Sequence, residues 1–139
     1  MLLAIRISGM VEVPKRVQEA LHRLRLRRKY SAVLIKPSNE NVKLLKKLRN
    51  FIAYGDIKPE VLAELIDKRG MPKDKSKKID AKKVIEELEK KKTTELSIKP
   101  FFRLHPPRGG IDSKKHFGVD KGVLGDNKEK INDLVRRML

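Results

Sequence analysis

Apolar runs alternate with amphipathic stretches along the first third of the chain. Residues 2–7 and 31–35 are almost continuously apolar, and each run is closed by polar or turn-forming residues, which is typical of buried strands. The stretch between them predicts a helix, with Pro14 in its first turn and apolar residues at helical spacing at Val17, Ala20, Leu21 and Leu24. The basic residues Arg16, Arg23 and Arg27 fall on one flank of that predicted helix, away from its apolar stripe.

A second helix is expected after Ser38, whose hydroxyl can cap it. Leu44, Leu45 and Leu48 form its inward side, while the lysines around them point outward. Residues 51–54 predict a third strand ended by Gly55, although by periodicity alone they could extend the helix. Residues 1–56 thus predict an α+β unit in which a three-stranded antiparallel sheet carries two helices on one face (β-α-β-α-β).

Residues 57–139 predict a helical extension with one further short strand, packed on the free face of that sheet. A helix over 59–69 has Pro59 in its first turn and Gly70 just beyond its end. The polar run 73–78 predicts an exposed loop. Asp80 can cap a following helix, whose apolar positions are Ala81, Val84, Ile85 and Leu88. The lysines at 90–92 suit either RNA or the helix dipole at its carboxyl end.

The end of the chain predicts a strand over 101–104 and a last helix. Asp126 and Glu129 resemble a capping box before that helix. Its apolar positions follow at i, i+3, i+4 and i+7, at Ile131, Leu134, Val135 and Met138. Residues 105–118 between the two elements are polar and turn-rich, so we expect a loop without secondary structure there. Its paired glycines and basic residues would let backbone lie close to phosphates.

Charge points to a polyanionic partner. The 139 residues hold 35 Lys plus Arg against 18 Asp plus Glu, a net charge of +17. Residues 14–49 alone hold 12 basic and 2 acidic residues. A phosphate backbone is the commonest polyanion that such a surface meets, and each contact releases counterions. A merely solubilising charge is the simpler alternative, but an excess this large also promotes non-specific binding.

Several other function classes fit the sequence poorly. The chain has no cysteine, which excludes disulfides and thiolate zinc sites. The apolar start, 1–7, is too short for a membrane span and lacks a signal-peptide pattern, so a cytoplasmic protein without membrane contact is expected. A metal or catalytic site would need His22, His105 and His116 with an acid such as Asp112, and their spacing matches no ligand pattern. We therefore expect no enzyme, cofactor or small-molecule substrate.

Two other non-enzymatic functions remain open for a chain of this composition. A chromatin or general nucleic-acid protein would also be basic, but only six Phe and Tyr residues are available as stacking platforms for single strands. A protein interaction module would explain the helices without explaining the charge.

The run Arg103-Leu104-His105-Pro106-Pro107-Arg108-Gly109-Gly110, followed by Lys115-His116, resembles the signature of one ribosomal family. That family is the large-subunit ribosomal protein numbered thirty in bacteria and archaea and seven in eukaryotes. The stretches 26–28, 51–55 and 61–70 also resemble it, so the resemblance covers most of the chain, and the archaeal type fits best. Between Gly70 and Pro100 the family varies, and no RNA contact is carried over there.

The resemblance implies a structural constituent of the large ribosomal subunit. Its partners would be large-subunit rRNA and neighbouring ribosomal proteins, and it would sit towards the 5S rRNA in the cytoplasmic ribosome. Residues 1–56 would be the core rRNA-binding unit and 57–139 the archaeal and eukaryotic extension. The positions that we predict to face phosphates are Arg16, Arg23, Arg27, Arg28, Lys29, Lys36, Lys46 and Lys47, joined by Arg103, His105, Arg108, Lys114, Lys115 and His116.

Overall fold

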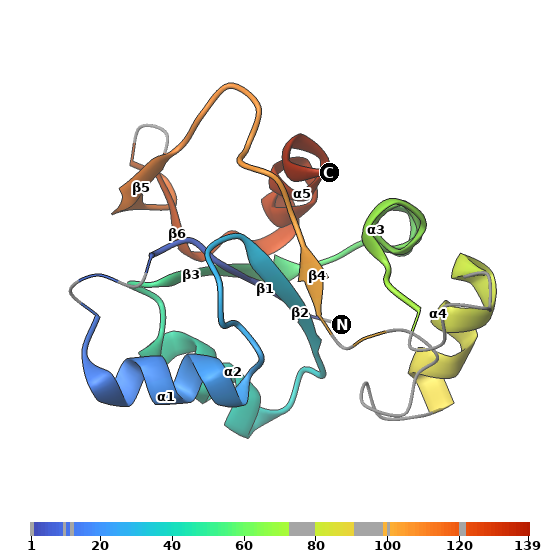
Figure 1. Ribbon diagram of the computed structural model, residues 1–139, viewed down its shortest axis with the longest axis horizontal. Helices are drawn as coiled ribbons and strands as arrows, with labels where there is room; N and C mark the ends of the chain where they lie inside the picture. Colours follow the sequence, from blue (N-terminus) through green and yellow to red (C-terminus); the bar gives the residue numbers. More distant parts are fainter. Residues whose placement is uncertain are drawn as a thin grey trace.

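A computed structural model describes residues 2–9, 11, 13–72, 80–90, 99, 101–119 and 122–139 (Figure 1). The predicted loop at 73–78 lies outside these residues, as do Lys91 and Lys92. The elements are, in chain order, β1 (Leu2–Arg6), α1 (Lys15–Arg23), β2 (Ser31–Ile35), α2 (Asn39–Lys47), β3 (Ile52–Asp56), α3 (Pro59–Arg69), α4 (Ala81–Lys90), β4 (Phe102–Arg103), β5 (Asp112–His116), β6 (Gly122–Asp126), a 3-10 turn η2 (Lys128–Lys130) and α5 (Ile131–Met138).

The centre of the fold is the predicted antiparallel sheet. Strand β1 lies between β2 and β3, with Leu3 opposite Leu34 on one side and Gly55 on the other. The α+β prediction is confirmed, and residues 52–54 belong to strand β3 instead of extending α2. The strand continues through Gly55 to Asp56, so Gly55 does not end it as predicted. The sheet is larger than predicted, however: it has six strands in the order β4-β2-β1-β3-β6-β5 and it is mixed. Strand β4 pairs antiparallel with β2, whereas β6 pairs parallel with β3 and β5 parallel with β6.

Strand β5 corrects the expectation that residues 105–118 lack secondary structure, and strand β6 was not predicted. Strand β5 is the polar sequence Asp-Ser-Lys-Lys-His and lies at the edge of the sheet. It pairs with β6, whose Val123 and Leu124 are buried. Because β5 is extended through pairing and not through burial of an apolar face, it has no alternating pattern that marks a strand.

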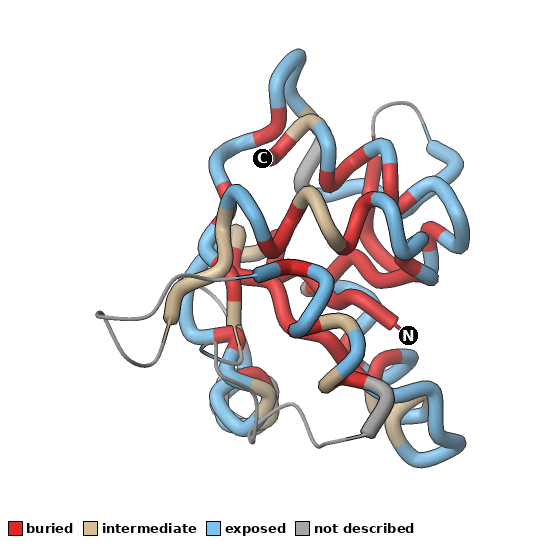
Figure 2. Tube along the Cα trace, turned by 90° about the vertical axis from the view of Figure 1, so that its right-hand side faces the viewer, coloured by how far each residue is buried: buried red, intermediate tan, exposed pale blue. Residues whose placement is uncertain are grey.

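Both faces of the central sheet are covered, which explains why its strands are continuously apolar. Side chains alternate across a strand, so Leu2 and Ala4 of β1 join the core between the sheet and the helices α1 and α2. Leu3 and Ile5 join the core on the other face of the sheet. Figure 1 shows α1 and α2 below the sheet and α3 and α5 on its other side. The buried segments in Figure 2 follow the strands and the inward sides of the helices.

The helix signals predicted from the sequence are confirmed for α2, α3 and α4, whereas Pro14 is the N-cap residue of α1 and lies just before its first turn. Helix α3 runs from Pro59 to Arg69 with Gly70 beyond it. The Asn41 N–H donates to Ser38 Oγ at 3.2 Å, and the Lys82 N–H donates to Asp80 Oδ1 at 3.1 Å. The four predicted apolar positions of the last helix are all buried in α5.

The predicted capping box before the last helix is replaced by a different arrangement. The Lys128 N–H donates to Asp126 Oδ1 at 2.9 Å, so Asp126 binds the first residue of the 3-10 turn η2, whose N-cap residue is Asn127. Helix α5 then starts at Ile131, and Lys130 at its N-cap supplies no side-chain hydrogen bond. The short turn was not predicted because it carries the same polar, helix-compatible residues as a first helical turn.

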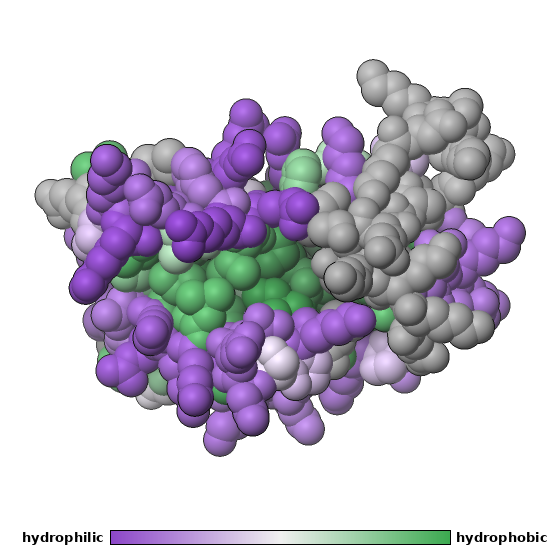
Figure 3. Space-filling view, turned by 90° about the horizontal axis from the view of Figure 1, so that it is seen from below, coloured by the Kyte–Doolittle hydropathy of each residue, from purple (hydrophilic) through white to green (hydrophobic). Residues whose placement is uncertain are grey.

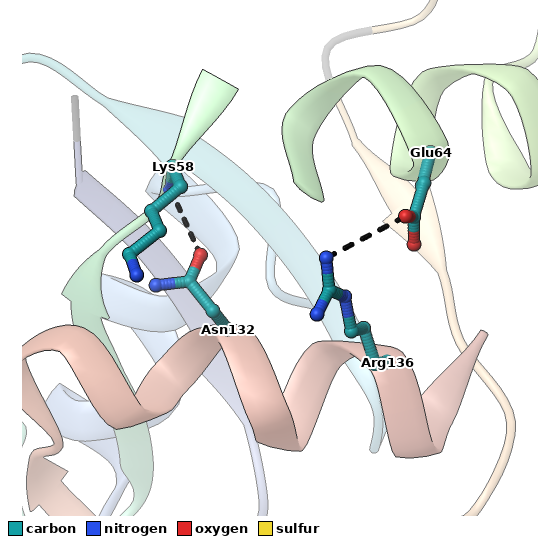
Figure 4. Close-up of polar contacts among 4 residues, drawn as sticks. All are labelled: Lys58, Glu64, Asn132 and Arg136. Atoms are coloured by element: carbon teal, nitrogen blue, oxygen red, sulfur yellow. Dashed lines mark hydrogen bonds and ion pairs between the residues drawn. The ribbon is translucent and has the colours of Figure 1, made fainter. Parts of the chain in front are cut away.

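Asn132 joins α5 to the end of β3 (Figure 4). Its Oδ1 accepts from the Lys58 N–H at 2.8 Å, and its Nδ2 donates to Asp56 O at 3.1 Å and to Glu129 O at 2.7 Å. The residue is almost fully buried. Nearby, Arg136 contacts Glu64 at 3.6 Å, with both side chains about half exposed.

We expect Asn132→Ala to lower the free energy of unfolding by about 2 kcal/mol, because a buried donor or acceptor without a partner costs about 1–3 kcal/mol. Arg136→Ala is the control, and an exposed ion pair contributes less than about 1 kcal/mol. Urea unfolding of both variants measures the difference. Equal stability of the two variants would contradict the role of Asn132.

Candidate nucleic-acid interface

The loop between α1 and β2 presents a group of arginines. Helix α1 ends at Arg23, so Arg27 lies in this loop and not on the helix, which corrects the predicted placement. Arg25 has a left-handed φ of 62°, and Leu26 is fully buried with its N–H donating to Leu21 O at 2.8 Å. With Leu26 anchored inward, Arg25, Arg27 and Arg28 are all exposed.

A buried arginine holds this loop from below. Arg6 of β1 has no exposed surface, and its Nη1 donates to Leu26 O at 2.7 Å. Its other guanidinium nitrogens donate to Ser8 O at 3.1 Å and Gly9 O at 3.2 Å. Burial lowers the pKa of Arg6 from its ordinary value, but an arginine in a protein keeps its charge. This role of Arg6 was not predicted, because Arg6 stands alone in an apolar run.

Strand β4 brings a second set of residues to the same place. Ser31 is paired with Arg103 across the β2–β4 ladder. Phe102 is buried, so the side chains of its neighbours Phe101 and Arg103 face the other way, towards the α1–β2 loop. The Arg103 guanidinium lies 5.6 Å from the centre of the Phe101 ring.

Together these residues line one pocket of about 330 Å³, which we call the arginine pocket. Its lining residues are Arg25, Arg27, Arg28, Ser31, Phe101 and Arg103. Three of the predicted residues thus meet in this pocket: Arg27 and Arg28 from the α1–β2 loop, and Arg103, which lies about 75 residues further along the chain. Arg25 and Phe101 were not predicted to belong to the site. Each stands next to a buried apolar residue, Leu26 or Phe102, and this was the pattern that could have indicated that they face outward. The described lining contains four guanidinium groups and no carboxylate, so it favours an anion.

A second group of predicted residues lies on α1 and α2. Arg16 and Lys47 flank an apolar groove of about 490 Å³, whose other lining residues are Val17, Ala20, Leu44 and Leu48. Figure 3, which views the molecule from the side of these helices, shows apolar surface hollowed between hydrophilic side chains. Long basic side chains commonly cover apolar surface with their stems while their charges stay in water.

The remaining residues predicted in the first third of the chain are exposed on neighbouring elements. Arg23 lies on α1 and Lys46 on α2. Lys36 follows the end of β2, and Lys29 places its amino group 5.1 Å from the centre of the Tyr30 ring.

The loop over 105–110 is tied to the end of α5. The Arg108 N–H donates to Arg137 O at 3.0 Å and the His105 N–H to Met138 O at 2.9 Å. The Arg137 guanidinium donates to Arg108 O at 2.8 Å and also to Gly110 O. Gly109 and Gly110 both have positive φ, which suits glycine. Arg137 was not predicted to act here, because α5 and the loop are distant in sequence.

We expect Arg137→Ala to raise the rate of tryptic cleavage after Arg108 by about tenfold. The guanidinium holds two carbonyl groups of this loop, and a hydrogen bond to a charged group contributes about 1.5–3 kcal/mol. Arg136→Ala is the matched control, since Arg136 contacts Glu64 on α3 instead. Equal cleavage rates in both variants would contradict the anchoring role of Arg137.

The fourteen predicted residues do not form one continuous patch. Lys114, Lys115 and His116 lie on β5, at the edge of the sheet opposite Arg103 on β4. Five strand spacings of about 4.8 Å separate those edges, which is roughly 24 Å. The structure therefore offers separate basic regions at both ends of the sheet, with α1 and α2 between them on one face.

Metal ligands or a long apolar helix would point to other kinds of site. Across the described parts of the chain, no three His, Asp or Glu side chains gather where they could hold a metal ion. None of the described helices has the length and apolar character needed to cross a membrane.

Known proteins similar to this chain decide its family. A family model described as ribosomal protein L30p/L7e matches residues 2–52, from β1 to the start of β3. The large ribosomal subunit protein uL30 of Methanobrevibacter smithii is 38% identical over 152 residues, covering the whole of both chains. The chain belongs to the ribosomal protein L30p/L7e family. Proteins with the same name from Aeropyrum pernix and Nanoarchaeum equitans are 37% and 39% identical, over 97% and 96% of this chain and 96% of each relative.

Membership of the L30p/L7e family confirms the resemblance inferred from the sequence, including its archaeal character. The family is structural and non-enzymatic. The relatives also extend across β4 and α5, which lie beyond the residues that the family model matches.

Proposed function

We propose that this protein is a structural constituent of the cytoplasmic large ribosomal subunit and that it binds rRNA through its basic surfaces. The relatives are named as large-subunit proteins. The observation that carries the rRNA part is the arginine pocket, where residues from the first and last thirds of the chain bring four guanidinium groups together. Guanidinium forks match phosphate oxygens in bidentate geometry and are the preferred contacts for them.

The proposed mechanism is clamping of several phosphates on folded RNA. The arginine pocket and β5 lie at opposite edges of the sheet, so the protein would meet more than one RNA segment. Contacts to phosphates fix register and orientation, while folded RNA is recognised mostly by shape. A rigid sheet with anchored loops suits such a role. Neighbouring ribosomal proteins and a position towards the 5S rRNA belong to the same proposal.

The proposal also assigns different roles to two parts of the chain. Residues 1–56 would be the core rRNA-binding unit, and residues 57–139 an extension packed on it. Strand pairing between the two parts supports this arrangement. Strand β4 of the extension pairs with β2 of the core, and β6 of the extension pairs with β3. Arg103 from the extension completes the pocket that the core begins.

Equilibrium binding to purified large-subunit rRNA, with duplex DNA of equal mass as competitor, tests the proposal. We expect tight binding to rRNA at about 0.2 M salt, a steep fall in affinity with added salt, and weak competition by the DNA. Equal affinity for both nucleic acids would contradict it and would favour a general basic nucleic-acid-binding protein outside the ribosome.

A further inference from the structure

We propose that the arginine pocket receives one unpaired nucleotide of the bound RNA, with its base stacked on Phe101 and its phosphates held by the arginines of the α1–β2 loop. This inference rests on the proposed rRNA binding and goes beyond it, because phosphate clamping alone needs no base in a pocket.

The size and shape of the pocket favour a single nucleotide. Its volume of about 330 Å³ lies at the small end of the range of roughly 300–1,000 Å³ for ligand pockets. Paired bases in an RNA duplex are stacked inside the helix and cannot enter such a pocket. Unpaired bases in loops and bulges can be splayed out and stacked on aromatic rings or arginine planes.

Phe101 gives the pocket a planar surface that a phosphate site would not require. The ring is half-buried and packs against the core under α1 and α2, so it is held in place. Arg103 lies on the same side, 5.6 Å from the ring centre. Phe102 between them is buried in the core on the other face of the sheet. This burial holds the backbone of Phe101 and Arg103 in place, so both side chains point into the pocket.

The charges around that ring are equally fixed in position. Leu26 is buried beneath Arg25 and Arg27, and Arg6 donates to its carbonyl oxygen. The arginine backbone is therefore held while the guanidinium groups remain exposed. Ser31 adds a hydroxyl group to the lining, and a hydroxyl can donate to or accept from a base edge. The lining thus combines groups for a base with groups for the phosphates on either side of it.

The test compares Phe101→Leu with Phe51→Leu in binding to large-subunit rRNA. Phe51 is the matched control because it is also half-buried and packs on the same core, but it does not line the pocket. We expect Phe101→Leu to lower the affinity by about 5- to 100-fold, as loss of one base–aromatic stack does. The slope of log affinity against log salt should stay unchanged, since no phosphate contact is removed. Phe101→Tyr should keep the wild-type affinity.

Chemical probing of the rRNA bases gives a second readout that does not depend on how well the leucine variant folds. We expect at least one unpaired base to lose reactivity on binding of the wild-type protein, Phe101→Tyr and Phe51→Leu. If no unpaired base is protected, the inference is overturned. Equal affinities of Phe101→Leu and Phe51→Leu would also overturn it. In either case steep, salt-dependent binding of the wild type to rRNA would leave the proposed function standing, whereas failure of the wild type to bind would overturn both.

Free nucleotides are the other source of the same chemistry. We expect the four nucleoside monophosphates, added at millimolar concentration, not to displace rRNA from the protein. Displacement that depends on Phe101 would show that the pocket takes a free nucleotide and would overturn the assignment to RNA.

Discussion

The double variant Arg27→Ala and Arg28→Ala should bind large-subunit rRNA about a hundredfold more weakly than the wild type. Both residues line the arginine pocket, and each hydrogen bond to a charged group contributes about 1.5 kcal/mol or more. Loss of two phosphate contacts should also make the slope of log affinity against log salt shallower by about 1.4 to 1.8. Filter binding or fluorescence titration over a range of salt concentrations measures both quantities.

The control for this prediction removes the same charge elsewhere. Lys82 and Lys83 are both exposed on α4, in the part of the chain where acidic and basic residues are mixed. Lys82→Ala with Lys83→Ala should leave the salt slope almost unchanged and weaken binding only slightly. If both double variants behave alike, net charge and not the arginine pocket governs binding.

Gly55→Ala should lower the free energy of unfolding by about 3 kcal/mol, because overpacking a filled site costs about 1–3 kcal/mol and more where backbone must move. A Cβ at this position of β3 would lie 2.3 Å from the Lys128 carbonyl oxygen and 3.0 Å from Ile131 Cβ. Relief would require η2 and the start of α5 to move away from the sheet. Urea unfolding monitored by circular dichroism measures the loss.

Gly9→Ala is the matched control for that substitution. A Cβ at Gly9 meets no atom within 4 Å, and we expect a change within about 0.5 kcal/mol. If Gly55→Ala is as stable as Gly9→Ala, the close approach of η2 to β3 does not stabilise the fold as described.

The elements that the sequence predicted share a physical origin. Strands β1, β2 and β3 are buried on both faces and therefore form continuous apolar runs, and the helices carry local start and stop signals such as Pro59, Gly70 and Asp80. Strands β5 and β6 lack such signals. They pair in parallel and not as a hairpin, and β5 is polar throughout, so neither local propensity nor periodicity marked them.

The candidate site was predictable in composition but not in arrangement. Counting charges located the arginines of the α1–β2 loop, and the resemblance to a family pointed to Arg103. Their meeting depends on the pairing of β4 with β2, which is set by the global topology. For the same reason the anchoring of the loop 105–110 by Arg137 became visible only when α5 was placed beside that loop.

Density-gradient fractionation of native cell extract, at moderate and then high salt, tests whether the protein is held in the large ribosomal subunit by rRNA. The protein should migrate with large subunits and intact ribosomes, and RNase treatment should abolish this co-migration. A peak among free proteins, or one that follows DNA, would contradict it.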